Sequence, residues 1–100
     1  MIEVTQHKDK ISIRGHANYA EHGKDIVCSA VSVLVQTLIQ SVENLTADRI
    51  EYSMSPGTVD IKFWSLSDQS KVLIDSFFIG IKGIAEAHPA NVKLTELSSH

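Results

Sequence analysis

The stretch that decides the fold runs from Asp25 to Leu45 and reads DIVCSAVSVLVQTLIQSVENL. Asp25 is a preferred N-cap residue, and the residues after it are strongly apolar. Those with helical spacing are Val31, Leu34, Val35, Leu38, Ile39, Val42 and Leu45. Val27, Ala30 and Val33 widen this apolar stripe. The pattern predicts a helix from Ile26 that is buried on more than one side, with a second face that a partner subunit could cover.

Alternating segments flank this helix on both sides. Ile2 and Val4 alternate with polar neighbours, and the alternation resumes at Ile11 and Ile13 after a charged turn, which predicts a β-hairpin. A second hairpin is predicted after the helix. Its apolar residues are Ile50, Tyr52 and Met54 before the Pro56-Gly57 turn, and Val59, Ile61 and Phe63 after it.

The last third of the chain predicts one more helix and a strand. Ser65-Leu66-Ser67-Asp68 resembles a capping box. The residues on one face of the helix that follows are Leu73, Phe77, Gly80, Ile81 and Ile84. His88-Pro89 ends this helix, and Val92 and Leu94 predict a short final strand. Gly80 and Gly83 inside the helix indicate close packing against the sheet or a partner.

The predicted order is therefore ββαββαβ, an α+β sandwich of two helices on a mainly antiparallel sheet, in one domain over residues 1–100. A length of 100 residues, 43% of them hydrophobic and 21% charged, suits a soluble globular domain. The net charge of -3 argues against direct nucleic-acid binding, which favours a basic face. The sequence shows no leader and no apolar run that approaches membrane-spanning length, so no membrane association is expected.

Cys28 is the only cysteine, and it occupies the third position of the predicted first helix. A single cysteine excludes an intrachain disulfide and fits the reducing cytoplasm. The first turn of a helix has unpaired N–H groups and the positive end of the helix dipole, and both favour thiolate over thiol. The same N–H groups could form an oxyanion hole. Cys28 is thus a candidate nucleophile.

His16 lies at the end of a predicted strand, twelve residues before Cys28. It could take the proton from the thiol and later give it to the leaving amine. The alternative for Cys28 is a buried structural cysteine, since cysteine is among the most commonly buried residue types. The helix-start position and the polar, glycine-flanked loop before it favour a functional thiol.

Residues 15–32 resemble the signature of the bacterial ribosomal-processing cysteine proteases, the Prp family. Gly15-His16-Ala17 matches the Gly-His-Ala element of that signature. Residues 23–32, GKDIVCSAVS, match its Gly-x-Asp-Ile-Val-Cys-x-Ala-Val-Ser element. The length, the element order and the ending Gly83, His88-Pro89 and Val92 agree as well, although family members often carry an aromatic residue where His88 stands.

The resemblance implies a cysteine endopeptidase that removes the N-terminal extension of large-subunit ribosomal protein twenty-seven during ribosome assembly. It implies a homodimer, with Cys28 as nucleophile and His16 as general base and acid. The loop from Ala17 to Lys24 would be a mobile gate, with hinges at Gly15 and Gly23. Within this gate, Asn18, Tyr19 and His22 are the other residues that would lie near the site. Tyr19 could pack on an apolar substrate side chain or against the protein itself.

Asp25 and Ser32 could each support catalysis or have a purely structural role. Asp25 could orient His16 as a third catalytic member, or its carboxylate could only cap the helix. Ser32, one turn after Cys28, could contact the site or only pack within the helix. His16, His22, Asp25 and Cys28 lack the tight ligand pairs of a structural zinc site, so no metal or other cofactor is expected.

Two other functions remain open for a chain with these residues. One is a non-catalytic ribosome-assembly or interaction module whose cysteine is structural. The other is a different thiol hydrolase or an acyl transferase, because fold and dyad alone do not determine the substrate.

Overall fold

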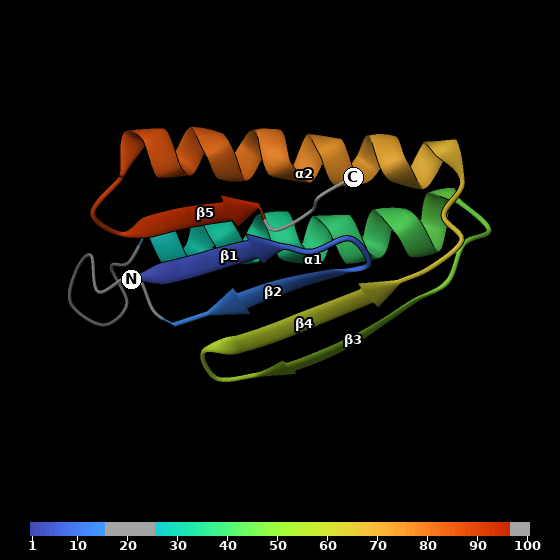
Figure 1. Ribbon diagram of the computed structural model, residues 1–100, viewed down its shortest axis with the longest axis horizontal. Coiled ribbons are helices and arrows are strands. Elements are labelled where there is room, and N and C mark those ends of the chain that lie inside the picture. The colour runs from blue at the N-terminus through green and yellow to red at the C-terminus, as the bar shows by residue number, and fades with distance from the viewer. Residues whose placement is uncertain (16–25, 97–100) are drawn as a thin grey trace.

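The computed structural model describes residues 1–15 and 26–96, which form a single sheet with two helices (Figure 1). The elements are β1 (Ile2–Gln6), β2 (Lys10–Arg14), α1 (Ile26–Leu45), β3 (Ile50–Ser55), β4 (Thr58–Phe63), α2 (Asp68–Ala87) and β5 (Val92–Glu96). The predicted order ββαββαβ and the α+β class are confirmed.

The sheet has the strand order β3-β4-β2-β1-β5. Every neighbouring pair is antiparallel except β1 and β5, which are parallel. Only the two-residue Pro56-Gly57 turn joins β3 to β4, and Gly57 has a φ of 72° there, which a glycine adopts without steric cost. The consequence for the site is that β3 lies at one edge of the sheet, where β4 is its one neighbour among the described strands.

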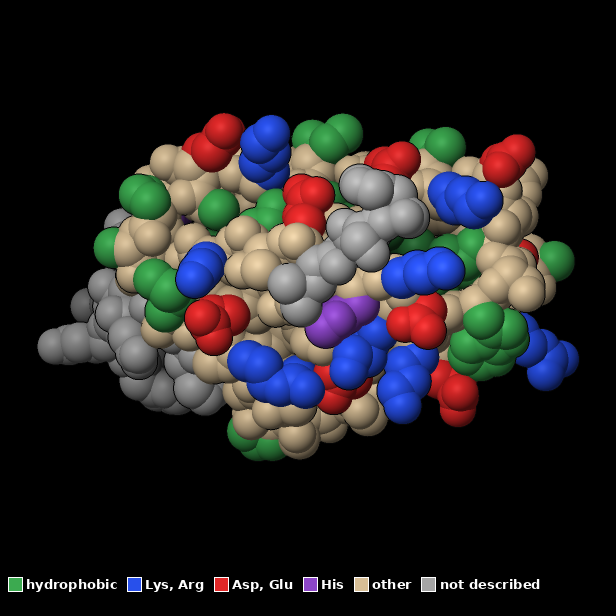
Figure 2. All heavy atoms as spheres, viewed as in Figure 1, with side chains coloured by type: hydrophobic (Ala, Val, Ile, Leu, Met, Phe, Trp, Pro, Cys, Tyr) green, Lys and Arg blue, Asp and Glu red, His purple; other side chains and the backbone are tan. Residues whose placement is uncertain are grey.

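The hydrophobic core lies between the sheet and the helices. From the strands it takes Ile2, Val4, Ile11, Ile13, Ile61, Phe63 and Val92; from the helices it takes Val27, Val31, Val35, Leu38, Ile39, Val42, Ile74, Phe77 and Ile81. The alternate residues of the strands form the outer face of the sheet, where acidic and basic side chains are interspersed (Figure 2). On this face Arg14 donates hydrogen bonds to both carboxylate oxygens of Asp60, at 2.9 and 3.0 Å. These contacts hold the pKa of Asp60 below its ordinary value.

Helix α1 is buried against the sheet and against α2. At Gly80 of α2 a Cβ atom would lie 2.9 Å from both terminal methyl groups of Leu34, so the two helices approach each other closely there. Close packing is found at Gly80, but against α1 rather than against the sheet or a partner as predicted, and nothing lies within 4 Å of a Cβ at Gly83. Val33 is 62% exposed, so the prediction that it widens the buried stripe was wrong.

The length and composition of α1 are also those of a membrane-spanning helix, so the expectation that no apolar run approaches this length was wrong. Six of its residues are buried in the core: Val27, Val31, Val35, Leu38, Ile39 and Val42. Burial of each such side chain contributes roughly 1.5–3 kcal/mol, which explains why a helix this apolar belongs to the folded core.

Helix α2 begins at a cap that differs from the predicted one. Ser67, rather than Ser65, is the N-cap residue, and its hydroxyl accepts a hydrogen bond from the N–H of Ser70. Ser65 precedes the helix with a positive φ of 52°. Asp48, in the connection between α1 and β3, accepts hydrogen bonds from the hydroxyl of Ser67 at 2.6 Å, from its N–H at 2.9 Å and from the buried Ser70 hydroxyl. These donors lower the pKa of Asp48.

Candidate active site

Cys28 lies in the first turn of α1, because the helix begins at Ile26. The predicted position of the thiol at the start of the helix is therefore confirmed. Its side chain is partly buried and packs against the edge of the hydrophobic core. Ser32 follows one turn later and is exposed. A partly buried thiol in a first turn is accessible to a reactant and close to the N-terminal amides of the helix.

A cavity of about 200 Å³ joins Cys28 and Ser32 to the ends of the strands. Its lining is mainly apolar and consists of Ile2, Ile13, Gly15, Cys28, Val31, Ser32, Val35, Met54, Ser55, Gly57, Thr58 and Val59. Among the described residues that line this cavity, Cys28 is the nucleophile of high intrinsic reactivity, and Ser32, Ser55 and Thr58 add hydroxyl groups.

Gly15 closes one side of this cavity. Its N–H donates a hydrogen bond to the carbonyl oxygen of Gly57 at 2.9 Å, which ties the end of β2 to the β3–β4 turn. Its φ is 93°, in the region that favours glycine, and a Cβ atom there would overlap the carbonyl oxygen of Met1. The position therefore requires glycine for two independent reasons.

The other predicted site residues lie outside the residues that the structure describes. They are His16, Ala17, Asn18, Tyr19, His22, Gly23 and Asp25. The pairing of His16 with Cys28, the two alternatives for Asp25 and the gating role of the loop therefore stay predictions. Among the described residues, Gly15, Cys28 and Ser32 are brought together in one cavity.

Sequence reasoning did not identify the cavity residues from β3 and β4. Met54, Ser55 and Val59 line the pocket because the Pro56-Gly57 turn brings these strand ends beside the start of α1. The turn itself is recognisable in the sequence. Its position next to Cys28 depends on the β2–β4 pairing, in which Ile13 lies opposite Val59.

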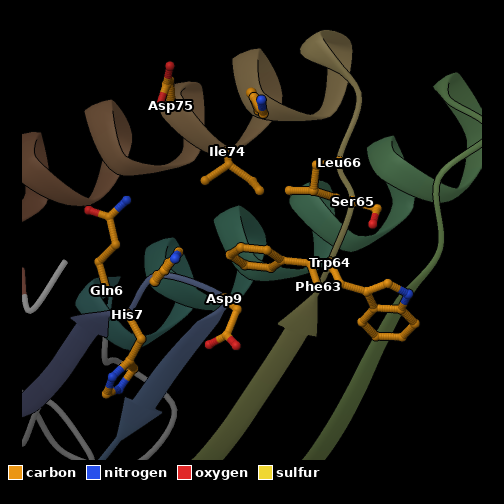
Figure 3. A pocket seen from close by; sticks show the side chains of 11 residues that line it. Gln6, His7, Asp9, Phe63, Trp64, Ser65, Leu66, Ile74 and Asp75 are labelled. Atoms are coloured by element: carbon orange, nitrogen blue, oxygen red, sulfur yellow. The ribbon is translucent and has the colours of Figure 1, made fainter. Parts of the chain in front are cut away.

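A larger cavity of about 470 Å³ lies beside the β1–β2 turn and α2 (Figure 3). Its charged residues include Lys8, Asp9, Lys71 and Asp75, which balance in sign, and Trp64 points away from its centre. It contains no cysteine. Of these two cavities, therefore, only the smaller one contains a thiol in the first turn of a helix. In the ranges 1–15 and 26–96, no group of three His, Cys, Asp or Glu side chains could bind a metal ion.

A thiol at a helix start, facing a mainly apolar cavity on an α+β sandwich, is typical of cysteine-dependent hydrolases. Comparison with known proteins agrees and is more specific. The chain belongs to the cysteine protease Prp family, whose model matches residues 1–93. The family that residues 15–32 indicated is thus confirmed.

Curated relatives have the same family identity. The ribosomal processing cysteine protease Prp of Mycoplasma genitalium is 27% identical over 100 residues, which cover 98% of each chain. The ribosomal processing cysteine protease Prp of Staphylococcus aureus is 26% identical over 83 residues, which cover 80% of this chain and 78% of the relative.

Solved structures share the fold. The structure of the SMU.848 protein of Streptococcus mutans matches with a TM-score of 0.84 at 29% sequence identity. The match covers 99% of this chain and 96% of the S. mutans chain. The S. aureus protease Prp, in complex with a covalently linked product peptide, has a TM-score of 0.92 at 22% identity, over 96% of this chain and 99% of the relative. Another S. aureus Prp structure contains a substrate peptide, and its TM-score is 0.80 at 20% identity, over 95% of this chain and 96% of the relative.

Proposed function

We propose that this protein is the endopeptidase that removes the N-terminal extension of large-subunit ribosomal protein twenty-seven, with Cys28 as nucleophile and His16 as general base and acid. The observation that carries the proposal is the position of Cys28, partly buried in the first turn of α1 and facing a mainly apolar cavity in a member of a protease family. The S. aureus protease whose structure contains a covalently linked product peptide supports covalent chemistry of this kind.

The reaction has two stages. In the first, His16 takes the proton of the Cys28 thiol, the sulfur attacks the scissile carbonyl carbon, and the resulting oxyanion is stabilised by N–H groups of the first turn of α1. The intermediate collapses as the C–N bond breaks, and the amine leaves with the proton from His16. In the second stage, His16 deprotonates a water molecule that attacks the thioester. Collapse of this intermediate releases the carboxylate product and restores the thiol.

The remaining predicted residues have supporting roles in this proposal. Asp25 caps α1 and so holds the first turn, and thereby Cys28, in place. Ser32 lines the cavity and offers a hydroxyl to the substrate. The loop from Ala17 to Lys24 gates the site, with Gly15 and Gly23 as its hinges.

The assembly and the compartment belong to the same proposal. The exposed face of α1 favours a homodimer, because its residues up to Gln40, which include Ser29, Val33, Gln36 and Thr37, are uncharged, and the charge of Glu43 lies beyond them toward the C-terminal end. The expected compartment is the cytoplasm, where ribosomes assemble and where a single reduced cysteine is maintained.

The test is mass spectrometry of ribosomal protein twenty-seven from the same organism after incubation with this protein. We expect one cut in the N-terminal extension, before a small residue, and no cut with Cys28→Ser. The variant Val72→Ala, at an exposed position of α2 outside the cavity, controls for nonspecific change and should cut normally. An intact substrate beside a thiol that alkylates readily would exclude this substrate. An intact substrate beside an inert thiol would exclude the enzyme and favour an interaction module.

A further inference from the structure

Strand β3 is an edge strand whose main-chain groups are available on one side. It lies beside β4 at the edge of the sheet, and all its residues from Glu51 to Ser55 are exposed. Ser55 lies opposite Thr58 across the two-residue turn, which makes that pair the first hydrogen-bonded one of the ladder. Because hydrogen-bonded pairs alternate, Tyr52 and Met54 direct their N–H and C=O groups away from β4, toward the open edge.

The side chains of the same two residues form an exposed apolar surface. Tyr52 lies opposite Ile61 and Met54 opposite Val59, so both face the side of the sheet that carries the core. Nevertheless they are 48% and 51% exposed. An exposed, apolar strand edge invites pairing with another extended chain.

This edge leads directly to the thiol. Met54 and Ser55 line the same cavity as Cys28, and β3 runs toward that cavity from Ile50. Its six residues at about 3.3 Å each extend over roughly 20 Å, enough for an extended peptide segment of five or six residues. A second copy of the chain on this edge would obstruct the approach to Cys28, whereas a substrate there would deliver its scissile bond to the sulfur.

We infer that the substrate peptide binds by β-augmentation: the segment on one side of its scissile bond adds to the sheet as a sixth strand along β3. Every second residue of that segment places an apolar side chain on Tyr52 and Met54, and its main chain bonds with theirs. The ligand is therefore an extended peptide with apolar residues at alternate positions. The inference rests on the proposed peptidase function and adds the surface that aligns the substrate.

An amide-to-ester scan of the substrate tests the main-chain bonds. The probe is a synthetic peptide that contains the N-terminal extension and the first residues of mature ribosomal protein twenty-seven, with one backbone N–H replaced by oxygen at a time. We expect kcat/KM to fall about three- to tenfold at every second position on one side of the cut, and to change little at the positions between. Equal sensitivity at neighbouring positions, with normal cleavage of the unmodified peptide, would overturn the inferred pairing of the substrate with β3 and leave the proposed peptidase function intact. No cleavage of the unmodified peptide would overturn the proposed function itself.

Side-chain variants provide an independent test. Met54→Gln and Tyr52→Ser should lower kcat/KM for the unmodified peptide by fivefold or more, chiefly through KM. Because about half of each side chain is exposed, the melting temperature should fall by no more than a few degrees. The matched control is Ile79→Gln on α2, where the side chain is 74% exposed and lies outside the cavity; it should cleave normally. Equal activity of all three variants would overturn the inference. A loss of dimer in sedimentation, with activity restored at high enzyme concentration, would instead assign the edge to a second copy.

Discussion

The N–H of Gly15, at the end of β2, donates a hydrogen bond of 2.9 Å to the carbonyl oxygen of Gly57 in the β3–β4 turn. The two glycines belong to segments more than forty residues apart, and both line the cavity that contains Cys28. Both also have positive φ values, 93° and 72°. The wall of the cavity opposite α1 therefore depends on two backbone conformations that other residues adopt at a cost.

Gly15→Ala should consequently destabilise the protein and impair cleavage. The positive φ alone costs an L-residue roughly 1–2 kcal/mol, and the added Cβ would also overlap the carbonyl oxygen of Met1, so β1 must shift. Thermal denaturation followed by circular dichroism, with a peptide cleavage assay in parallel, measures both effects. A variant as stable and as active as the parent would show that the end of β2 does not require this conformation.

The proposed dyad predicts different losses for its two members. Cys28→Ala should abolish cleavage with little change in stability, because the thiol is only partly buried. His16→Ala should lower kcat by about 10²–10⁴-fold, the usual contribution of a general acid–base group. It should also slow alkylation of Cys28 by iodoacetamide. Turnover above background with Cys28→Ala would reject the nucleophile, and a rate within tenfold of the parent with His16→Ala would remove the histidine from the mechanism.

Asp25→Asn separates the two alternatives for the aspartate. Asparagine caps helices nearly as well as aspartate, so a residue that only caps should tolerate the change with kcat/KM within a few-fold of the parent. We expect this outcome. Asp25→Ala is the companion variant and should lower the free energy of unfolding by about 0.5–2 kcal/mol through loss of the cap, which a lower melting temperature would report. A thousandfold loss of activity with asparagine would place the carboxylate in the catalytic set.

The sequence predicts the elements well because each of them has an apolar face with its own period. The alternation of Ile2 and Val4, and the helical spacing of Val31 and Val35, follow from burial of one face against a common core. Tyr52 and Met54 show the limit of this reasoning. Their alternation predicts a strand correctly, but only the strand order reveals that β3 is an edge whose apolar side chains remain half exposed.

The candidate site was predictable only in part, for a similar reason. Cys28 and Gly15 could be identified from a local pattern, because a helix start and a strand end are local features. Met54 and Val59 could not, since their place in the cavity depends on pairing between strands distant in sequence. The cap of α2 was misplaced because Ser65 and Ser67 both have a side chain suited to an N-cap, and a contact with the distant Asp48 distinguishes them.

The two glycines of α2 should respond in opposite ways to alanine. Gly83→Ala should stabilise the protein by about 0.5–1 kcal/mol, since alanine is the better helix former and its Cβ meets nothing within 4 Å. At Gly80 the added Cβ would press on Leu34, so the gain in helix propensity is offset by overpacking between α1 and α2. Gly80→Ala should therefore remain at or below the stability of the parent in urea denaturation. A stabilisation equal to that at Gly83 would show that Leu34 moves freely.

Asp48 predicts a defined pH dependence of stability. Hydrogen bonds from Ser67 and Ser70 lower its pKa from the ordinary 3.8, so the folded state favours the carboxylate more than the unfolded state does. This contribution is complete above the unfolded value and is lost as the pH falls through the lower, folded value. Asp48→Asn should thus lower the melting temperature by a few degrees at pH 7, and the difference from the parent should narrow below about pH 3.8. Glu43→Gln, which removes an equal charge from the exposed surface of α1, is the control and should show little difference at either pH. A deficit for Asp48→Asn that stays constant into acid would mean that the side chain stabilises the fold by its shape rather than by its charge.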